Sequence, residues 1–315
     1  NTPTKDNIDA FSGKRMAAKI LDGNQVAGKI KSELASTIKD WQESGYKRPT
    51  LAVVLVGDDP ASSIYVKGKE RDCLEVGIES KSYRLPNTIE QEKIEDLLDE
   101  LNSDPSIDGI LVQSPIPDHL DENKLIDKIS VDKDVDGFHP YNIGRLTVRR
   151  PHFRSCTPKG IMQLLDHIDF EYKKSKAVII GASNHVGRPM GLELLLAGTT
   201  VTTTHKFTQS ISETTREADL LVSAVGKAGL VPGTWIKPGA VVIDVGITRG
   251  ESNKLYGDVD FESASRVASW ITPVPGGVGP MTRVALLQNT MESVSKKFGI
   301  DWSSDKNYQI EPASS

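Results

Sequence analysis

Cysteine is scarce in this sequence, with only Cys73 and Cys156 among 315 residues. Two cysteines exclude a disulfide framework, and neither belongs to a C-x-x-C pair of the kind that binds structural zinc. No apolar run approaches the roughly 20 residues that span a bilayer, and the formal net charge of −5 shows no excess of basic residues. These absences disfavour a secreted disulfide-rich domain, a membrane protein and a protein that follows a nucleic-acid backbone. We therefore expect a cytoplasmic protein without a metal, membrane or nucleic-acid partner.

Both ends of the chain lack the features of folded or targeting segments. Residues 1–15 are polar, include Asp6 and Asp9, and have no apolar central stretch, which argues against secretory and organelle signals. We expect residues 1–15 to be a leader outside the fold, which opens at Met16. The polar tail, residues 301–315, is expected to fray.

Apolar runs alternate with helical segments along the rest of the chain. This alternation predicts βαβ units and parallel sheets, and the length favours two domains. The polar segment 149–154, which contains Pro151, is the expected link between two lobes. The expected strands are residues 51–57, 110–112, 177–180, 201–204, 220–224 and 241–245; the expected helices are residues 24–43, 63–76, 89–101, 158–167, 186–196 and 280–297.

A glycine-rich turn follows one of these strands. Residues 177–180 run into Gly181-Ala182-Ser183-Asn-His-Val186-Gly187-Arg188 and then into a helix. Such a turn aims backbone N–H groups and the positive end of the helix at a phosphate. The match to the G-x-G-x-x-G dinucleotide pattern is imperfect, because Ser183 and Val186 stand at its second and third glycine positions. An ordinary strand-to-helix turn is the alternative.

The end of the following strand bears on the choice of dinucleotide. Residues 201–204 lead to His205 and Lys206, with a base and no acid at the strand's end. Sites that prefer NAD usually place an acid there for the ribose 2′-hydroxyl, whereas a cation favours the 2′-phosphate of NADP. The sequence thus favours NADP, unless Lys206 is only a solvated surface lysine.

A candidate chemical group lies after the first strand. Tyr65 and Lys69 are four residues apart, so they share one face of a helix. At the carboxyl edge of a parallel sheet that face would meet a ligand crevice, where a lysine suits acid/base work and a tyrosine can stack on a flat heterocycle. The alternative is a solvated helix that exposes Lys67, Lys69 and Arg71 to water.

Three further polar segments could contribute to the same crevice. Gln113 ends the strand 110–112, where an amide can bond a ligand or orient a lysine; otherwise it caps a turn. Asp136 lies in a turn and could accept hydrogen bonds from an aminopyrimidine edge, or could form an Asx-turn. The stretch 273–280 is rich in glycine and proline, so it either approaches a ligand closely or only connects a lobe to the last helix.

These features occur together within a series of longer motifs that resembles one family, from about Met16 to Lys297. The resemblance is to the bifunctional methylenetetrahydrofolate dehydrogenase/methenyltetrahydrofolate cyclohydrolases in their bacterial form. The motifs, in order, are Gly57-Asp-Asp-Pro-Ala-Ser62 with Tyr65-Val-x-x-Lys69, Gly109-Ile-Leu-Val-Gln113, Lys133-Asp-Val-Asp-Gly-Phe-His-Pro140, Cys156-Thr-Pro-Lys-Gly160, Gly181-Ala-Ser-Asn-x-Val-Gly-Arg-Pro-Met190, Gly239-Ala-Val-Val-Ile-Asp-Val-Gly-Ile247 and Ile271-Thr-Pro-Val-Pro-Gly-Gly-Val-Gly-Pro-Met-Thr282.

The resemblance implies an activity and a set of site residues. The enzyme would oxidise 5,10-methylenetetrahydrofolate with NADP and then hydrolyse the methenyl product to 10-formyltetrahydrofolate, in one-carbon metabolism and purine biosynthesis. The implied catalytic residues are Lys69, Gln113 and Asp136, the last of which would also hold the pterin. The implied folate-binding residues are Tyr65, Pro275, Gly276, Gly277 and Val278. The implied cofactor residues are Gly181, Ala182, Ser183, Val186, Gly187, Arg188, Lys206 and Ile247, with no metal.

The resemblance also implies the domain division and the assembly. Residues 16–154 with 280–300 would form a substrate lobe, to which the last helix returns, and residues 155–279 would form a Rossmann-type NADP lobe. The family is usually a homodimer through the cofactor domain.

Five residues depart from the family's usual pattern: Ala182, Ser114, His185, Thr248 and Arg283. We expect these departures to change rates or cofactor preference, because none removes a group that the chemistry needs. Arg283 would require solvent or an anionic partner. Three rival functions are a folate dehydrogenase with weak cyclohydrolase activity, a dehydrogenase for an amino acid or hydroxy acid, and a nucleotide sensor without activity.

Overall fold

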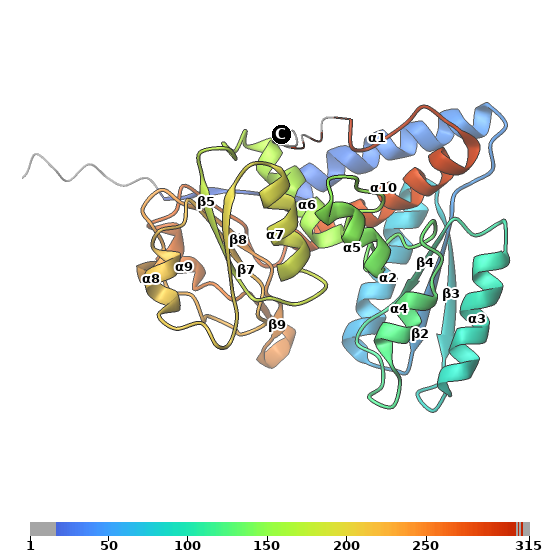
Figure 1. Ribbon diagram of the computed structural model, residues 1–315, viewed down its shortest axis with the longest axis horizontal. Helices are drawn as coiled ribbons and strands as arrows, with labels where there is room; N and C mark the ends of the chain where they lie inside the picture. Colours follow the sequence, from blue (N-terminus) through green and yellow to red (C-terminus); the bar gives the residue numbers. More distant parts are fainter. Residues whose placement is uncertain (1–16, 307, 309, 311–315) are drawn as a thin grey trace, which may run out of the picture.

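Two α/β lobes joined by long helices make up the structure, a computed structural model that describes residues 17–306, 308 and 310 (Figure 1). The expected leader, residues 1–15, lies outside the described residues. Each lobe has its own parallel sheet, which confirms the predicted fold class.

The substrate lobe is built on a three-stranded parallel sheet with the order β3-β2-β4. The central strand β2 (Thr50–Val56) is buried along its whole length, as its apolar sequence predicts for a strand with both faces covered. The neighbouring β3 (Glu79–Leu85) was missed, because it is an edge strand whose polar side chains face solvent. The remaining elements are α2 (Pro60–Val76), α3 (Gln91–Ser103), β4 (Gly109–Val112), α4 (Glu122–Lys128) and α5 (Pro140–Thr147).

The cofactor lobe contains a six-stranded sheet, all parallel, with the order β1-β11-β8-β7-β5-β6. The predicted domain division placed residues 16–154 in the substrate lobe. This prediction is wrong for β1 (Lys19–Ile20), which belongs to the sheet of the cofactor lobe. Lys19 and Ile20 instead pair with β11 (Trp270–Ile271), because this edge offers free backbone partners that a two-residue segment cannot supply itself. The other strands are β5 (Lys176–Ile180), β6 (Thr200–Thr204), β7 (Leu220–Ser223) and β8 (Val241–Asp244).

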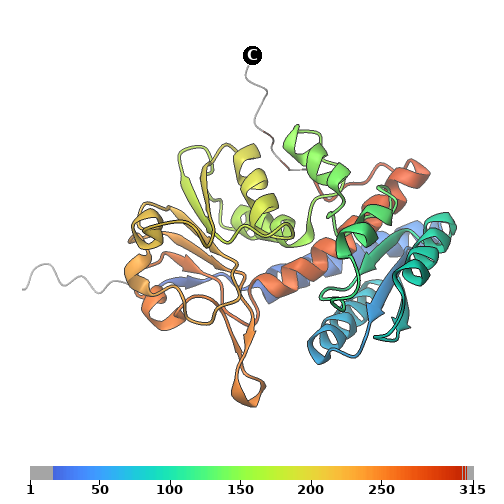
Figure 2. The ribbon, with the colours of Figure 1, turned by 60° about the horizontal axis from the view of Figure 1, so that its bottom comes forward.

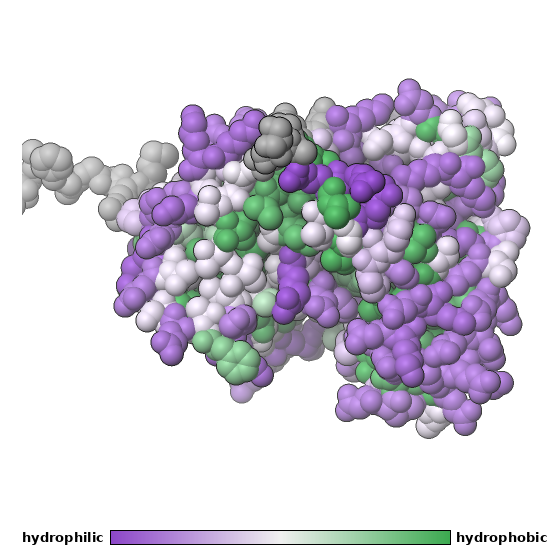
Figure 3. All heavy atoms as spheres, in the orientation of Figure 1, coloured by the Kyte–Doolittle hydropathy of each residue, from purple (hydrophilic) through white to green (hydrophobic). Residues whose placement is uncertain are grey.

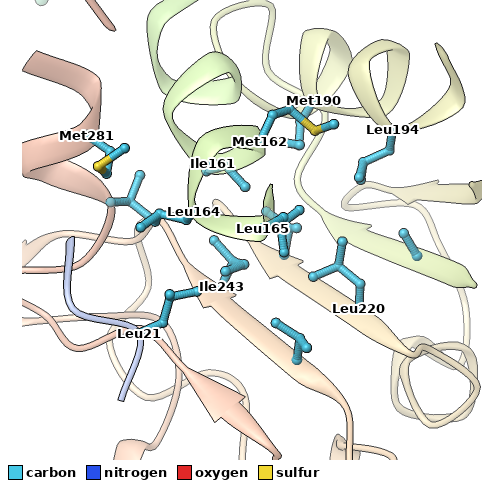
Figure 4. Packing of buried hydrophobic residues seen from close by; sticks show 14 of the residues in the cluster. Leu21, Ile161, Met162, Leu164, Leu165, Met190, Leu194, Leu220, Ile243 and Met281 are labelled. Atoms are coloured by element: carbon cyan, nitrogen blue, oxygen red, sulfur yellow. The ribbon is translucent and has the colours of Figure 1, made fainter. Parts of the chain in front are cut away.

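Helices cover both faces of the larger sheet, and successive strand residues point to opposite faces. On one face, Leu164 and Leu165 of α6 pack over Leu220 and Ile243 (Figure 4). On the other, Leu221 and Val242 join a separate apolar cluster. The elements of this lobe are α6 (Cys156–His167), α7 (Gly187–Leu196), α8 (Ile211–Thr215), α9 (Phe261–Ser265) and a projecting hairpin of β9 (Thr248–Arg249) and β10 (Leu255–Tyr256), seen in Figure 2.

Two helices of 21 residues each, α1 (Gly23–Glu43) and α10 (Val278–Phe298), join the lobes. Both helices run across the molecule in Figures 1 and 2. The first turns of α10 bury Met281 and Val284 in the core of the cofactor lobe, and its later turns bury Leu286 and Met291 in the core of the substrate lobe. The predicted return of the last helix is therefore confirmed, and the same helix also ties the two cores together.

The described part of the tail, residues 301–306, 308 and 310, does not fray as predicted. Trp302 packs edge-on against Trp41 of α1, with ring centroids 5.6 Å apart. Asp305 accepts a hydrogen bond of 2.9 Å from Nη1 of Arg154, which is buried in the segment between the lobes. A buried guanidinium requires charged partners, and the polar tail supplies one of them.

Candidate active site

A cavity of about 800 Å³ lies between the lobes. The helix α2 contributes Tyr65 and Lys69 from the substrate lobe, and the strand β4 leads to Gln113. The cofactor lobe contributes Ile247, just after the strand β8, and the glycine- and proline-rich loop 273–277 closes the cavity. The structure therefore brings together predicted residues that are far apart in the sequence, at the carboxyl ends of the strands, where open α/β sheets bind ligands.

The side chain of Lys69 is held by Gln113. The Nζ of Lys69 donates a hydrogen bond of 2.9 Å to Oε1 of Gln113, and the Nε2 of Gln113 donates one of 2.9 Å to the carbonyl oxygen of Ser114. Because Gln113 is buried, its amide is oriented and the lysine amine has one defined position. Lys69 is therefore hydrogen-bonded and only partly exposed, whereas Lys67 and Arg71 of the same helix are exposed.

Tyr65 and the loop 273–277 provide surfaces on either side of that amine. Tyr65 is 39% exposed and lines the cavity. The loop rests against the start of α1, where the carbonyl oxygen of Gly276 accepts hydrogen bonds from the backbone of Gly23 and Asn24. A Cβ on Gly23 would lie 1.7 Å from the carbonyl oxygen of Gly277, so this close contact depends on glycine. The loop is therefore a fixed wall, not a free connection.

Asp136 lies apart from the main cavity. It lines a small adjoining cavity with Ser114, Glu122 and Phe138, and the hydroxyl of Ser114 donates a hydrogen bond to Glu122. The structural role in this turn belongs to Asp134, which is buried and accepts hydrogen bonds from the backbone of His139 and from Asn142. Burial raises the pKa of Asp134 despite these bonds. The half-buried Asp136 thus stands beside the turn's structural carboxylate.

The glycine-rich turn between β5 and α7 depends on close backbone packing. Gly181 has a φ of 112°, and a Cβ on Gly187 would lie 2.0 Å from the carbonyl oxygen of Gly181. The Oγ of Ser183 accepts hydrogen bonds from the backbone N–H groups of Val186, at 3.2 Å, and Gly187, at 3.4 Å. Ser183, at the second glycine position, therefore holds the turn against the start of α7.

Basic side chains beside the turn are exposed. Arg188 is exposed, and its Nε donates a hydrogen bond of 3.0 Å to the carbonyl oxygen of Ala182. Lys206 follows β6, with Nζ 5.0 Å from the ring centroid of Phe207. His185, one of the departures, stacks on Phe138 of the other lobe at a centroid distance of 4.1 Å. The turn thus offers cations to a ligand and touches the substrate lobe.

The sequence reasoning did not single out Asp244, Arg249 or Asn24, which also line the cavity. Burial raises the pKa of Asp244 to about 6, and the backbone N–H groups of Val259 and Asp258 oppose that rise. Its position at the end of a predicted strand was the signal that could have identified it. Arg249 lies in the β9–β10 hairpin, which no local sequence pattern predicted.

In residues 17–306, 308 and 310, no three His, Cys, Asp or Glu side chains converge as a metal site would require. No helix there combines the length and apolar character that a membrane crossing needs.

The fold and the cleft define a two-lobed α/β enzyme with a dinucleotide-binding lobe. Residues 21–136 match the catalytic domain of tetrahydrofolate dehydrogenase/cyclohydrolase, and residues 155–298 match the NAD(P)-binding domain of the same proteins. The chain therefore belongs to the tetrahydrofolate dehydrogenase/cyclohydrolase family.

Solved structures agree with this membership. The bifunctional FolD methylenetetrahydrofolate dehydrogenase/cyclohydrolase of Campylobacter jejuni is 47% identical, with a TM-score of 0.87 over 89% of this chain and 100% of that one. The FolD enzyme of Trypanosoma brucei, solved with NADP cofactor and inhibitor, is 35% identical, with a TM-score of 0.87 over 90% and 99%. A methylenetetrahydrofolate dehydrogenase from the silkworm Bombyx mori is 38% identical, with a TM-score of 0.85 over 90% and 99%.

Proposed function

We propose that the single cleft between the lobes carries out both reactions of the family. The chain oxidises 5,10-methylenetetrahydrofolate to 5,10-methenyltetrahydrofolate with NADP and hydrolyses that product to 10-formyltetrahydrofolate. The observation that carries this proposal is the hydrogen bond of 2.9 Å between Lys69 and Gln113, in a cavity that Ile247 of the cofactor lobe also lines. One lysine amine thus faces the place where the two ligands meet.

In the oxidation the protein's task is to orient. NADP supplies the hydride acceptor, and the chemistry of that transfer belongs to the cofactor. Tyr65 stacks on the folate, the loop 275–278 supports its other side, and Ile247 contacts the nicotinamide side. Asp136 holds the pterin through hydrogen bonds to its aminopyrimidine edge, from the small cavity that adjoins the cleft. Holding two flat rings face to face removes most of the orientational cost of the reaction.

In the hydrolysis Lys69 moves a proton. The methenyl carbon is cationic, and water adds to it as the Nζ of Lys69 accepts a proton from that water. The same amine returns that proton to the ring nitrogen as its bond to the carbon breaks, while the carbon–oxygen bond becomes the formyl C=O and the hydroxyl proton is released to water. A lysine amine can exchange a proton in this way, whereas an arginine remains charged. Gln113 keeps Nζ in place through its oriented Oε1.

The cofactor assignment extends to single residues. The turn of Gly181, Ala182, Ser183, Val186 and Gly187 receives the pyrophosphate. In support, a Cβ on Gly187 would lie 2.0 Å from the carbonyl oxygen of Gly181, so the turn has a fixed glycine shape.

Lys206 and Arg188 bind the 2′-phosphate, since both are exposed cations beside that turn. The substrate lobe comprises residues 22–154 with 280–300, and the cofactor lobe residues 155–279 with 17–21, whose Ala18 and Leu21 pack against its sheet.

A turnover assay with purified protein tests the proposal. Absorbance is followed with methylenetetrahydrofolate and NADP, and then with NAD. NADPH formation without accumulation of methenyltetrahydrofolate supports both steps in one cleft. NADPH with accumulated methenyltetrahydrofolate leaves only the dehydrogenase, and turnover with NAD alone contradicts the assignment of Lys206.

The assembly and setting are also part of the proposal: a cytoplasmic homodimer, joined through the cofactor lobe, that serves one-carbon metabolism and purine biosynthesis. Leu195 and Phe207 of that lobe are 55% and 77% exposed, and Figure 3 shows apolar residues gathered over α6 and α7. Exposed apolar surface of this kind favours association. Light scattering on the purified chain tests it, and a mass of one chain at micromolar concentration contradicts it.

A further inference from the structure

Arg283 is a cation in the cleft that the proposed chemistry does not use. It lies in the second turn of α10 and lines the same cavity as Tyr65 and Lys69. Its Nε donates a hydrogen bond of 2.5 Å to Oδ2 of Asp72. Among the described residues, no hydrogen bond is found from its two terminal nitrogens, and the side chain is 29% exposed. Asp72 is therefore the anionic partner that Arg283 requires. The two terminal nitrogens of the Arg283 guanidinium remain available to a ligand.

The neighbouring helix α2 fixes the position of the Arg283 side chain. A Cβ on Gly68 would lie 3.5 Å from Cδ of Arg283, so the arginine stem crosses α2 where that helix has no side chain. Asp72 is 1% exposed, which makes it a buried anchor. A buried carboxylate stays charged only beside cations, and this requirement fixes the guanidinium at the cleft wall.

The surroundings of Asp72 leave positive charge in excess. Its Oδ1 lies 3.7 Å from Nζ of Lys31 and 3.6 Å from Nε of Arg71, and Lys31 also pairs with Glu75. Three cations, counting Arg283, thus share two carboxylates. Asp244, the one acid in the lining of the cleft, already accepts three backbone hydrogen bonds. This end of the cleft consequently favours an anion.

The guanidinium of Arg283 lies close to Lys69, the residue proposed to transfer the proton. Tyr65, Lys69 and Asp72 are spaced by four and three residues, so they follow one face of α2. Cδ of Arg283 packs at Gly68 and its Nε reaches Asp72, so its guanidinium lies within about one helical turn, roughly 5.4 Å of rise, of the position of Lys69 along α2. Tyr65, Lys69 and Arg283 line the same cleft, within which a ligand that reacts beside Lys69 extends its far end.

We propose that Arg283, anchored by Asp72, binds the carboxylates of the glutamate tail of the folate substrate. This inference rests on the proposed function and names a specificity residue for it. The tail of a folate ends in two carboxylates, and a guanidinium matches a carboxylate with two parallel hydrogen bonds. Lys67 and Arg71, which also line the cleft, are placed to meet further glutamates of a longer tail.

The test compares methylenetetrahydrofolate with methylenetetrahydropteroate, which has the same rings and no glutamate. The variant is Asp72→Ala/Arg283→Val, because removing both partners leaves no buried charge unpaired. KM for the folate is expected to rise about 10-fold or more, in line with the loss of a charge-assisted hydrogen bond. KM for the pteroate is expected to stay within about twofold, as is kcat for both.

Two further variants separate charge from structure. Arg283→Lys keeps the cation and is expected to recover part of the preference for the folate, whereas Arg266→Val removes an exposed arginine from the cofactor lobe and is expected to change neither KM. An equal rise of KM for folate and pteroate in the double variant indicates a structural role and overturns the proposal. An unchanged KM for the folate overturns it as well.

Binding of both compounds is measured by calorimetry alongside turnover. If the wild-type chain binds the folate more tightly than the pteroate through Arg283 but converts neither, the role of Arg283 is supported and the proposed function is contradicted. If it converts both equally well, the proposed function stands and the role of Arg283 is overturned.

Discussion

The two lobes prepare their sides of the cleft by different means. The substrate lobe uses side chains that hold one another, as Lys69 and Gln113 do. The cofactor lobe uses backbone shape, since Gly181 and Gly187 approach each other more closely than any side chain would allow. The substrate lobe should therefore lose its function when a side-chain group is removed, and the cofactor lobe when a methyl group is added.

Removing the amine of Lys69 is expected to have the largest effect. Lys69→Met should lower cyclohydrolase kcat by about 10²- to 10⁴-fold, the range for a lost proton-transfer group, while calorimetry should find NADP binding unchanged. The matched control is Lys39→Met, which deletes an equal charge from an exposed position on α1. Lost NADP binding in a folded Lys69→Met protein would contradict the division of labour between the lobes.

The comparison also depends on what joins the lobes. Nε and Nη2 of Arg154 donate hydrogen bonds of 2.8 and 2.9 Å to Glu193 of α7, and Asp305 of the tail binds the same guanidinium. Arg154→Met should lower the free energy of unfolding by about 3–5 kcal/mol, because it leaves the buried carboxylate of Glu193 without its cation. Urea unfolding measures this, with Arg266→Met as the exposed control. Equal stabilities would show that the network contributes little.

Adding one methyl group to the cofactor turn tests the other half of the comparison. A Cβ at Gly187 would collide with the carbonyl oxygen of Gly181, so Gly187→Ala should weaken NADP binding by about 100-fold, or about 2.7 kcal/mol. Gly28→Ala is the control, since a Cβ there meets nothing within 4 Å. Unchanged NADP affinity in Gly187→Ala would show that the turn tolerates rearrangement.

Acid should weaken the junction between the lobes. Burial opposes the charged form of Asp305, but Lys159 and Arg154 outweigh it and lower the pKa to about 2. The ordinary value is about 3.9. The resulting stabilisation, about 2 kcal/mol, is present above pH about 4 and is lost as the pH falls towards 2. Asp305→Asn should flatten that acid limb in thermal unfolding, and an unaltered limb would assign it to other groups.

The smallest effect is expected where the cofactor lobe does rely on a side chain. Lys206→Ala should raise KM for NADP by about 10-fold and leave KM for NAD nearly unchanged, since a charge-assisted hydrogen bond to a 2′-phosphate is worth about 1.5–3 kcal/mol. Steady-state kinetics with both cofactors measure this. Equal changes for NADP and NAD would remove the phosphate role and leave a general effect on the turn.

Particular residues show how much of the structure could be predicted from the sequence. The glycine-rich turn and the central strand β2 were predicted because local backbone needs and continuous apolar runs are visible in a few residues. The polar edge strand β3 and the pairing of Lys19–Ile20 with β11 were missed, because neither has a local pattern of its own. The docking of the tail was missed for the same reason, since its partner Arg154 is 151 residues away.

The sequence by itself determined the α/β class, the turn that suits a phosphate, and the shared helix face of Tyr65 and Lys69. These features follow from steric limits and periodicity within a single element. Only the tertiary structure decided that Gln113 holds Lys69, that Asp72 anchors Arg283 across 211 residues, and that both face one cleft. Such contacts depend on the order of strands in the sheets and on the return of the last helix, which bring distant residues within hydrogen-bonding distance.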